Sequence, residues 1–97
     1  MKYLVELNSS DTPPDFILRE LESEFDRAPQ QDEDPDIHRL AVENGSIRVL
    51  TDPENNRVWI TIESLSGEKV LDVRYRIESL LDRSKERGFI VWSQMAI

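Results

Sequence analysis

The stretch that decides the fold is residues 37–64, which read IHRLAVENGSIRVLTDPENNRVWITIES. Apolar and polar residues alternate in three runs, with a period of two that is typical of strands with one buried face. The runs are 37–43, 46–51 and 57–64. Asn44-Gly45, between the first two runs, is a strong hairpin signal, and a longer turn precedes the third run. The stretch therefore predicts a three-stranded antiparallel meander.

The residues before the meander predict a strand, a helix and a loop. Residues 2–7 alternate as a short strand does. A helix is expected to start within residues 12–15, where two prolines stand at positions that need no amide donor, and to run to about Ala28. Its apolar residues Ile17, Leu18, Leu21, Phe25 and Ala28 share an arc of about 100°. Residues 29–36 carry two prolines and four acids without a period, which predicts a mobile acidic loop.

The residues after the meander predict a second helix and a last strand. The helix begins at a Ser66 cap and ends at Gly88, the residue type expected just beyond a helix C-terminus. Its core stripe covers about 100° and consists of Val70, Val73, Ile77, Leu80, Leu81 and Ser84. Residues 89–97 are rich in β-branched and aromatic side chains, which favour a strand.

The expected order is β-α-β-β-β-α-β within a single domain of residues 1–97. This order predicts an α+β fold with a mostly antiparallel sheet and two helices on one face. In topology alone it is similar to a ferredoxin-like sandwich with an added strand. No apolar run approaches the roughly 20 residues of a membrane helix, so we expect a cytoplasmic protein without a membrane partner.

The charge of the chain is concentrated in its first third. The net charge is −8, and residues 1–36 carry eleven acids against three bases, whereas residues 37–97 carry nine of each. Such a local imbalance indicates a surface that attracts a positively charged partner. The residues expected to bind that partner are Glu20, Glu22, Glu24, Asp26, Asp32, Glu33, Asp34 and Asp36.

Several large apolar residues are expected to stay outside the core. Leu71 and Tyr75 lie away from the stripe of the second helix, and Trp59 points to the face opposite its apolar strand neighbours. If the helices cover one face only, Trp59 and some of Ile90, Trp92 or Leu50 face outward. Exposed apolar groups of this kind indicate self-association. The residues expected to mediate it are Trp59, Leu71, Tyr75 and Trp92.

The sequence offers few groups for catalysis, since it has one histidine and no cysteine. We predict that His38 fills a strand-edge or half-buried position rather than acting as a base. Four acids reproduce the ligand spacing of an EF-hand calcium loop, namely Asp32, Asp34, Asp36 and Glu43. Ile37 stands where that loop requires glycine, so we interpret the spacing as coincidence. We therefore predict no catalytic residue, no metal and no cofactor.

Two functional hypotheses follow from these patterns. The first is a non-enzymatic interaction module, a regulator or inhibitor that docks its acidic helix–loop surface on a basic protein, including one that ordinarily binds nucleic acid. Direct binding of nucleic acid is not expected, because the net charge repels phosphate. The alternative is a homodimeric ferredoxin-like domain that uses its exposed sheet face for a small ligand or for a structural role.

Overall fold

The computed structural model describes residues 1–8, 12–43, 45–63 and 68–95. Within these ranges the chain forms one sheet, two α-helices and a single turn of 3-10 helix. The elements in chain order are β1 (Lys2–Leu7), α1 (Asp15–Phe25), β2 (Gln30–Gln31), β3 (Ile37–Val42), β4 (Gly45–Asp52), η1 (Pro53–Asn55), β5 (Arg57–Glu63), α2 (Glu68–Glu86) and β6 (Ile90–Met95).

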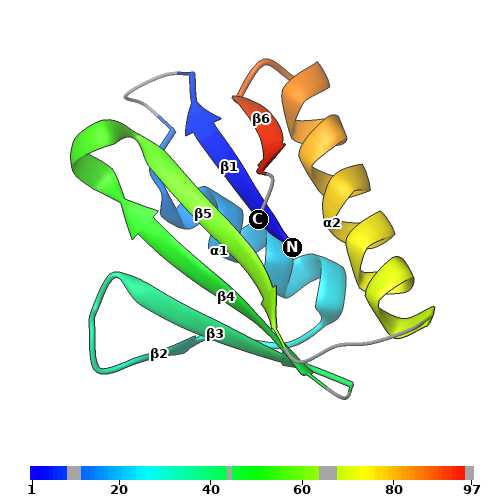
Figure 1. Ribbon diagram of the computed structural model, residues 1–97. Helices are drawn as coiled ribbons and strands as arrows, with labels where there is room; N and C mark the ends of the chain where they lie inside the picture. The colour runs from blue at the N-terminus through cyan, green and yellow to red at the C-terminus, as the bar shows by residue number, and fades with distance from the viewer. Residues whose placement is uncertain (9–11, 44, 64–67, 96–97) are drawn as a thin grey trace.

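The sheet has six strands in the order β2-β3-β4-β5-β1-β6, and every neighbouring pair is antiparallel. Figure 1 shows α1 behind the sheet and α2 alongside β6. The predicted α+β class, the antiparallel meander and the two helices are confirmed. The ferredoxin-like topology is not confirmed, because the strand order differs. Since β5 and β6 both pair antiparallel with β1, they run in the same direction, and α2 connects them across β1.

The core lies between one face of the sheet and the two helices. Alternate residues of each central strand point into it, as the period of two predicts. In β5 these are Val58, Ile60 and Ile62, and in β1 they are Tyr3, Val5 and Leu7. The core is completed by Leu40, Ile47, Val49, Ile90 and the buried residues of the helices, which are Ile17, Leu21, Val73, Ile77, Leu80 and Leu81.

Helix α1 is shorter than its apolar pattern predicts. Ile17 and Leu21 are buried as expected, but the helix ends at Phe25 rather than near Ala28. The next residue, Asp26, adopts a left-handed conformation with φ 53°, which stops the helical hydrogen bonding. Because the helix ends at Phe25, the chain returns to the sheet over the next few residues and forms β2.

Helix α2 follows its predicted stripe closely. Ser84 is the one polar residue of that stripe, and its hydroxyl donates to the Leu80 carbonyl at 3.1 Å, which satisfies the buried group. Gly88 follows the helix with φ 82°, a conformation that glycine adopts without steric cost. The predicted Ser66 cap lies outside the described residues. Within the described ranges, neither helix has the length and apolar character needed to cross a membrane.

The segment 29–36, predicted as a loop, contains a strand that sequence reasoning missed. Gln30 and Gln31 pair with β3, and the following turn is closed by the N–H of Asp32, which donates to the carbonyl of Ile37 at 2.8 Å. The N–H of Thr51 on β4 also donates to the carbonyl of Asp36 at 2.8 Å. These backbone hydrogen bonds attach the acidic turn to the edge of the sheet.

Candidate functional site

The predicted acidic surface divides into two parts. Glu20, Glu22, Glu24 and Asp26 lie on or directly after α1, whereas the other four acids belong to the turn between β2 and β3. Figure 1 places this turn at the far end of β2 from the C-terminal end of α1. The structure therefore does not gather the eight acids at one place. It presents a helix group and a turn group.

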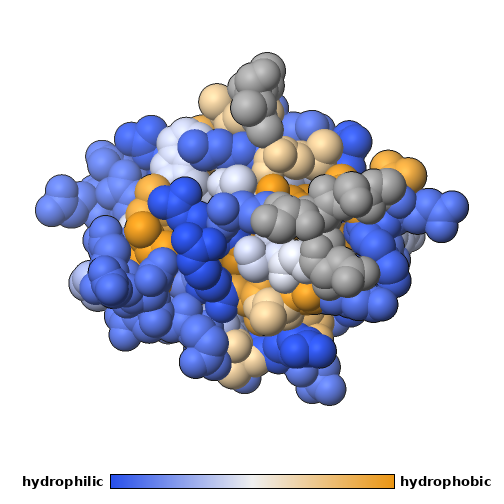
Figure 2. Space-filling view, turned by 60° about the horizontal axis from the view of Figure 1, so that its bottom comes forward, coloured by the Kyte–Doolittle hydropathy of each residue, from blue (hydrophilic) through white to orange (hydrophobic). Residues whose placement is uncertain are grey.

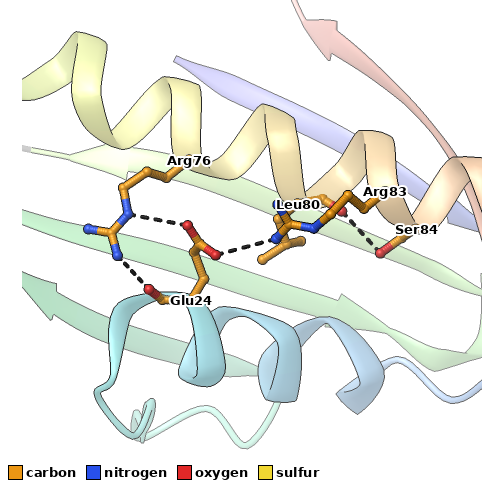
Figure 3. A network of polar contacts seen from close by, with 5 residues as sticks. All are labelled: Glu24, Arg76, Leu80, Arg83 and Ser84. Atoms are coloured by element: carbon orange, nitrogen blue, oxygen red, sulfur yellow. Dashed lines mark hydrogen bonds and ion pairs between the residues drawn. The ribbon is translucent and has the colours of Figure 1, made fainter.

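Glu24 is engaged inside the fold. Its carboxylate accepts from Nε of Arg76 and from Nη2 of Arg83, both at 3.3 Å, and Figure 3 shows it between these two arginines of α2. Arg76 also donates to the backbone carbonyl of Glu24 and lies 4.3 Å from the ring centre of Phe25. The Glu24 side chain is only 25% exposed. Its acidic group thus holds α1 against α2, a role that the charge pattern did not reveal.

Asp32 is also paired. One of its oxygens accepts from the backbone N–H of Glu33 at 2.8 Å, and the other accepts from Nε of Arg39 at 3.2 Å. The Glu33 amide and then Arg39 hold the pKa of Asp32 below its ordinary value. Arg39 donates to Glu63 as well, at 2.9 Å, so this arginine joins the acidic turn to β5.

The other six acids of the predicted surface form no ion pair with a basic side chain of the described residues. In the described part of the chain, no ion pair involves the six acids Glu20, Glu22, Asp26, Glu33, Asp34 and Asp36. All of them except Glu20, which is half-buried, are exposed. One carboxylate oxygen of Asp34 accepts from the N–H of Asp36 at 2.9 Å and shapes the turn. These six residues are what remains of the predicted docking surface.

The sheet face away from the helices carries an apolar row, as predicted for Trp59. The registers of β3, β4, β5 and β1 align Ile37, Leu50, Trp59 and Leu4 across this open face. Nζ of Lys2 lies 4.8 Å from the centre of the Trp59 ring. Of the three candidates expected to share this face with Trp59, only Leu50 does so.

Trp92 points to the helix side, so its assignment to the exposed sheet face is wrong. Its indole N–H donates to Asp82 of α2 at 3.1 Å, and its ring meets the edge of Tyr3 at 5.8 Å. The reason is register: Trp92 stands opposite Val5, and both point to the core face. Ile90 has the same parity and is fully buried. The parity of β6 depends on its pairing with β1, which the local sequence does not specify.

A polar network connects β1, α2 and β6. The Tyr3 hydroxyl donates to Glu78 at 2.9 Å, and Nε of Arg74 donates to the same carboxylate oxygen at 2.6 Å. Arg74 also donates to the side-chain carbonyl of Gln94 at 3.2 Å. Burial, followed by the hydrogen bond to Glu78 and the negative charge of that carboxylate, raises the pKa of the Tyr3 phenol well above its ordinary value. The network fixes how α2 lies against the last two strands of the sheet.

β6 is the last strand of the sheet, and no strand of the described residues pairs with its outer side, which is called its free edge below. Among the described residues, the exposed large hydrophobic ones are Leu71, Tyr75, Val91 and Met95, with exposures of 63%, 72%, 45% and 36%. The first two lie on α2 and the other two on β6. A shallow hollow of about 380 Å³ runs along the outer side of α2, lined by Leu71, Arg74, Tyr75, Glu78, Ser79 and Asp82. Leu71 and Tyr75 are exposed as predicted.

A second hollow lies where the end of α1 meets the start of α2. It measures about 200 Å³ and is lined by Phe25, Arg27, Val42, Glu43, Lys69, Asp72, Val73 and Arg76. Nζ of Lys69 lies 2.9 Å from a carboxylate oxygen of Glu43 across this region. Figure 2 shows the surface from the side at the bottom of Figure 1, where apolar patches are surrounded by hydrophilic side chains.

The calcium-loop spacing does not bring its acids together. Glu43 follows β3, and the whole length of that strand separates it from Asp32, Asp34 and Asp36. No group of three or more potential metal ligands occurs among the described residues. His38 is half-buried on the core side of β3, in the strand position predicted for it.

The chain matches no protein-family model, and no curated protein is significantly similar to it.

Proposed function

We propose that the chain is a non-enzymatic protein-interaction module that binds through the free edge of β6 and the adjoining side of α2. The observation that carries this proposal is that the four exposed large hydrophobic residues of the described chain lie on two neighbouring elements, Val91 and Met95 on the edge strand β6 and Leu71 and Tyr75 on α2 alongside it. Exposed apolar groups gathered at one place are typical of interaction sites. A free strand edge adds backbone hydrogen bonds to such a site when another strand pairs with it.

The two edges of the sheet differ in a way that supports this choice. The edge strand β2 has two residues and continues into a turn of four acids, and charge and shortness both discourage pairing. By contrast β6, with the sequence IVWSQM, has six residues, no proline and no charged side chain. In a chain of which 33% is charged, an uncharged edge strand is a distinctive signal. That signal was available in the sequence once β6 was known to be an edge.

Substituting Val91→Lys tests the proposal, because a charge on an edge strand opposes pairing with another strand. We expect the wild-type amides of Trp92 and Gln94 to be protected from hydrogen exchange when the edge is covered, and the variant to lose this protection. Ala41→Lys is the matched control, since it adds the same charge at an exposed position of β3. Exchange would be measured for the concentrated protein, alone and with extract of its source. Unprotected Trp92 and Gln94 amides in every wild-type sample would contradict the proposed function.

The acidic residues support a second candidate function, docking on a basic protein as a regulator or inhibitor. The open sheet face carries four basic residues, Lys2, Arg39, Arg48 and Arg57, and three acidic ones, Glu6, Asp52 and Glu63. The acidic residues that give the chain its net charge of −8 therefore lie mostly on surfaces other than this face. A molecule with its charge so divided presents its acidic side to a cationic partner at long range.

Neutral substitutions test whether the exposed acidic residues dock on a partner or only keep the protein soluble. The variant with Glu22→Gln, Asp26→Asn, Glu33→Gln and Asp34→Asn keeps the internal ion pairs of Glu24 and Asp32. We expect it to associate more slowly with a basic partner protein and to show a flatter salt dependence, because steering by exposed charges is screened by salt. Stopped-flow association at low and high salt measures both effects. Equal rates for variant and wild type at low salt would remove this candidate.

A further inference from the structure

The outer edge of β6 presents the backbone groups of alternate residues. The N–H of Asn8 donates to the carbonyl of Phe89 at 3.0 Å, so the Phe89 carbonyl points toward β1. In an antiparallel pair, successive residues direct their N–H and C=O groups to opposite sides of the strand. The residues that direct these groups to the outer edge are therefore Ile90, Trp92 and Gln94.

We propose that a second copy of this chain occupies this edge, with the two β6 strands antiparallel about a two-fold axis at Ser93. This inference rests on the proposed function, because it names the occupant of the same surface. In this register Trp92 of each copy pairs with Gln94 of the other. Both residues direct their backbone groups outward, so the two pairs form four inter-subunit hydrogen bonds. Ser93 faces its own counterpart in a non-hydrogen-bonded pair.

The same register brings together the exposed apolar residues of β6. An axis at Ser93 places Val91 of each copy opposite Met95 of the other on the open sheet face. These two side chains are 45% and 36% exposed in the single chain. Directly opposite residues of a non-hydrogen-bonded pair have the closest side chains in an antiparallel sheet. The pairing therefore covers part of both apolar side chains at once.

The charges on α2 are self-complementary under this axis. Arg74 is level with Gln94, to which it donates at 3.2 Å, and Asp82 is level with Trp92, from which it accepts at 3.1 Å. Because the axis exchanges the levels of Trp92 and Gln94, Arg74 of each helix is level with Asp82 of the other. Glu78 lies between them near the axis, where its carboxylate is already bound by Arg74 and by the Tyr3 hydroxyl.

A second copy fits this edge better than an unrelated strand, because one symmetry operation satisfies three separate features. It pairs the outward backbone groups, it packs the two exposed apolar residues of β6 against each other, and it sets opposite charges of α2 at the same level. A two-fold interface requires such self-complementarity, since each residue contacts the counterpart of its own partner. For an unrelated extended segment, pairing with the edge requires the backbone groups alone and does not require the other two features.

Crosslinking through an introduced cysteine tests the register directly, because the chain contains no cysteine of its own. In Ser93→Cys the two Cα atoms would be about 4.5 Å apart, inside the range of roughly 4.4–6.8 Å that disulfides require. We expect mild oxidation to give a covalent dimer. Val91→Cys is the matched control: its two copies would stand four residues apart, about 13 Å, and stay uncrosslinked. Light scattering of the wild type should give twice the 11.3 kDa mass of one chain.

Each other result has a distinct meaning. A dimer in which Val91→Cys crosslinks and Ser93→Cys does not would overturn the proposed axis. A wild type that scatters as a monomer at high concentration, with no crosslink in either variant, would overturn the second copy as occupant. If the protein is a monomer but extract of its source still protects the Trp92 and Gln94 amides from exchange, the proposed function stands and only the dimer is overturned. If those amides exchange freely in every sample, both the dimer and the proposed function are overturned. The two failures are therefore distinguishable.

Discussion

The variant Leu21→Ala is expected to lose about 2–5 kcal/mol of the free energy of unfolding, because it leaves a cavity between α1 and the sheet. Leu21 is fully buried, and it shares this environment on α1 only with Ile17 among the described residues. The native state of a domain is stable by about 5–15 kcal/mol, so the substitution removes a large share of the total.

Helix α1 depends strongly on this side chain, because the rest of the helix contributes little. It spans eleven residues, and isolated helices shorter than about 12–15 residues are marginal in water. Its first turn has no side-chain cap, and its last turn has no basic residue to complement the helix dipole. Packing of Ile17 and Leu21, together with the ion pairs of Glu24, therefore holds α1 in place.

Urea unfolding followed by circular dichroism measures the loss, and Leu18→Ala on the same helix is the matched control. Leu18 is only partly buried against the core. We expect its truncation to cost clearly less than that of Leu21, because the surrounding solvent fills most of the space that it leaves. Equal losses for the two variants would show that helix propensity, rather than core packing, sets the stability of α1.

The core of the fold was predictable because it follows local periods. The runs 37–43, 46–51 and 57–64 place their core residues at every second position, and the structure pairs them in that order. The stripe of α2 repeats at helical spacing, and five of its six predicted members are buried. Such patterns need no knowledge of the rest of the chain. β2 was missed because two glutamines have neither a period nor an apolar face, and only the β3 edge makes them a strand.

The candidate site was less predictable, because it depends on contacts between distant residues. Glu24 and Arg76 are 52 positions apart, and nothing local distinguishes Glu24 from its exposed acidic neighbours. Likewise the face of Trp92 depends on its register with Val5. The exposure of Leu71 and Tyr75 was predicted correctly, since a helix has a fixed angle per residue. Which strand forms the free edge is a property of the whole sheet, and no single segment encodes it.

The variant Tyr3→Phe is expected to lose about 1.5–3 kcal/mol of unfolding free energy near neutral pH, the usual contribution of a hydrogen bond to a charged group. Phenylalanine keeps the ring that packs against Trp92, so the change isolates the hydroxyl that donates to Glu78. Tyr75→Phe is the matched control, because its side chain is 72% exposed and its hydroxyl remains in water in the folded chain. We expect no loss in this control when the protein is dilute enough to be monomeric.

The pH dependence gives a second, independent readout of the same hydroxyl. Folding raises the pKa of Tyr3 above its ordinary value of 10.0, first through burial and then through Glu78. The contribution of Tyr3 is therefore complete below pH 10 and declines as the pH rises further, because the unfolded chain releases the phenolic proton while the folded chain retains it. Tyr3→Phe lacks this proton, so the comparison of the two proteins isolates the phenol of Tyr3. The difference in stability between wild type and Tyr3→Phe should thus stay constant from about pH 8 to about pH 9 and shrink from about pH 10 to about pH 11. A constant difference over that range would mean that the folded state does not favour the neutral phenol, and would contradict this prediction.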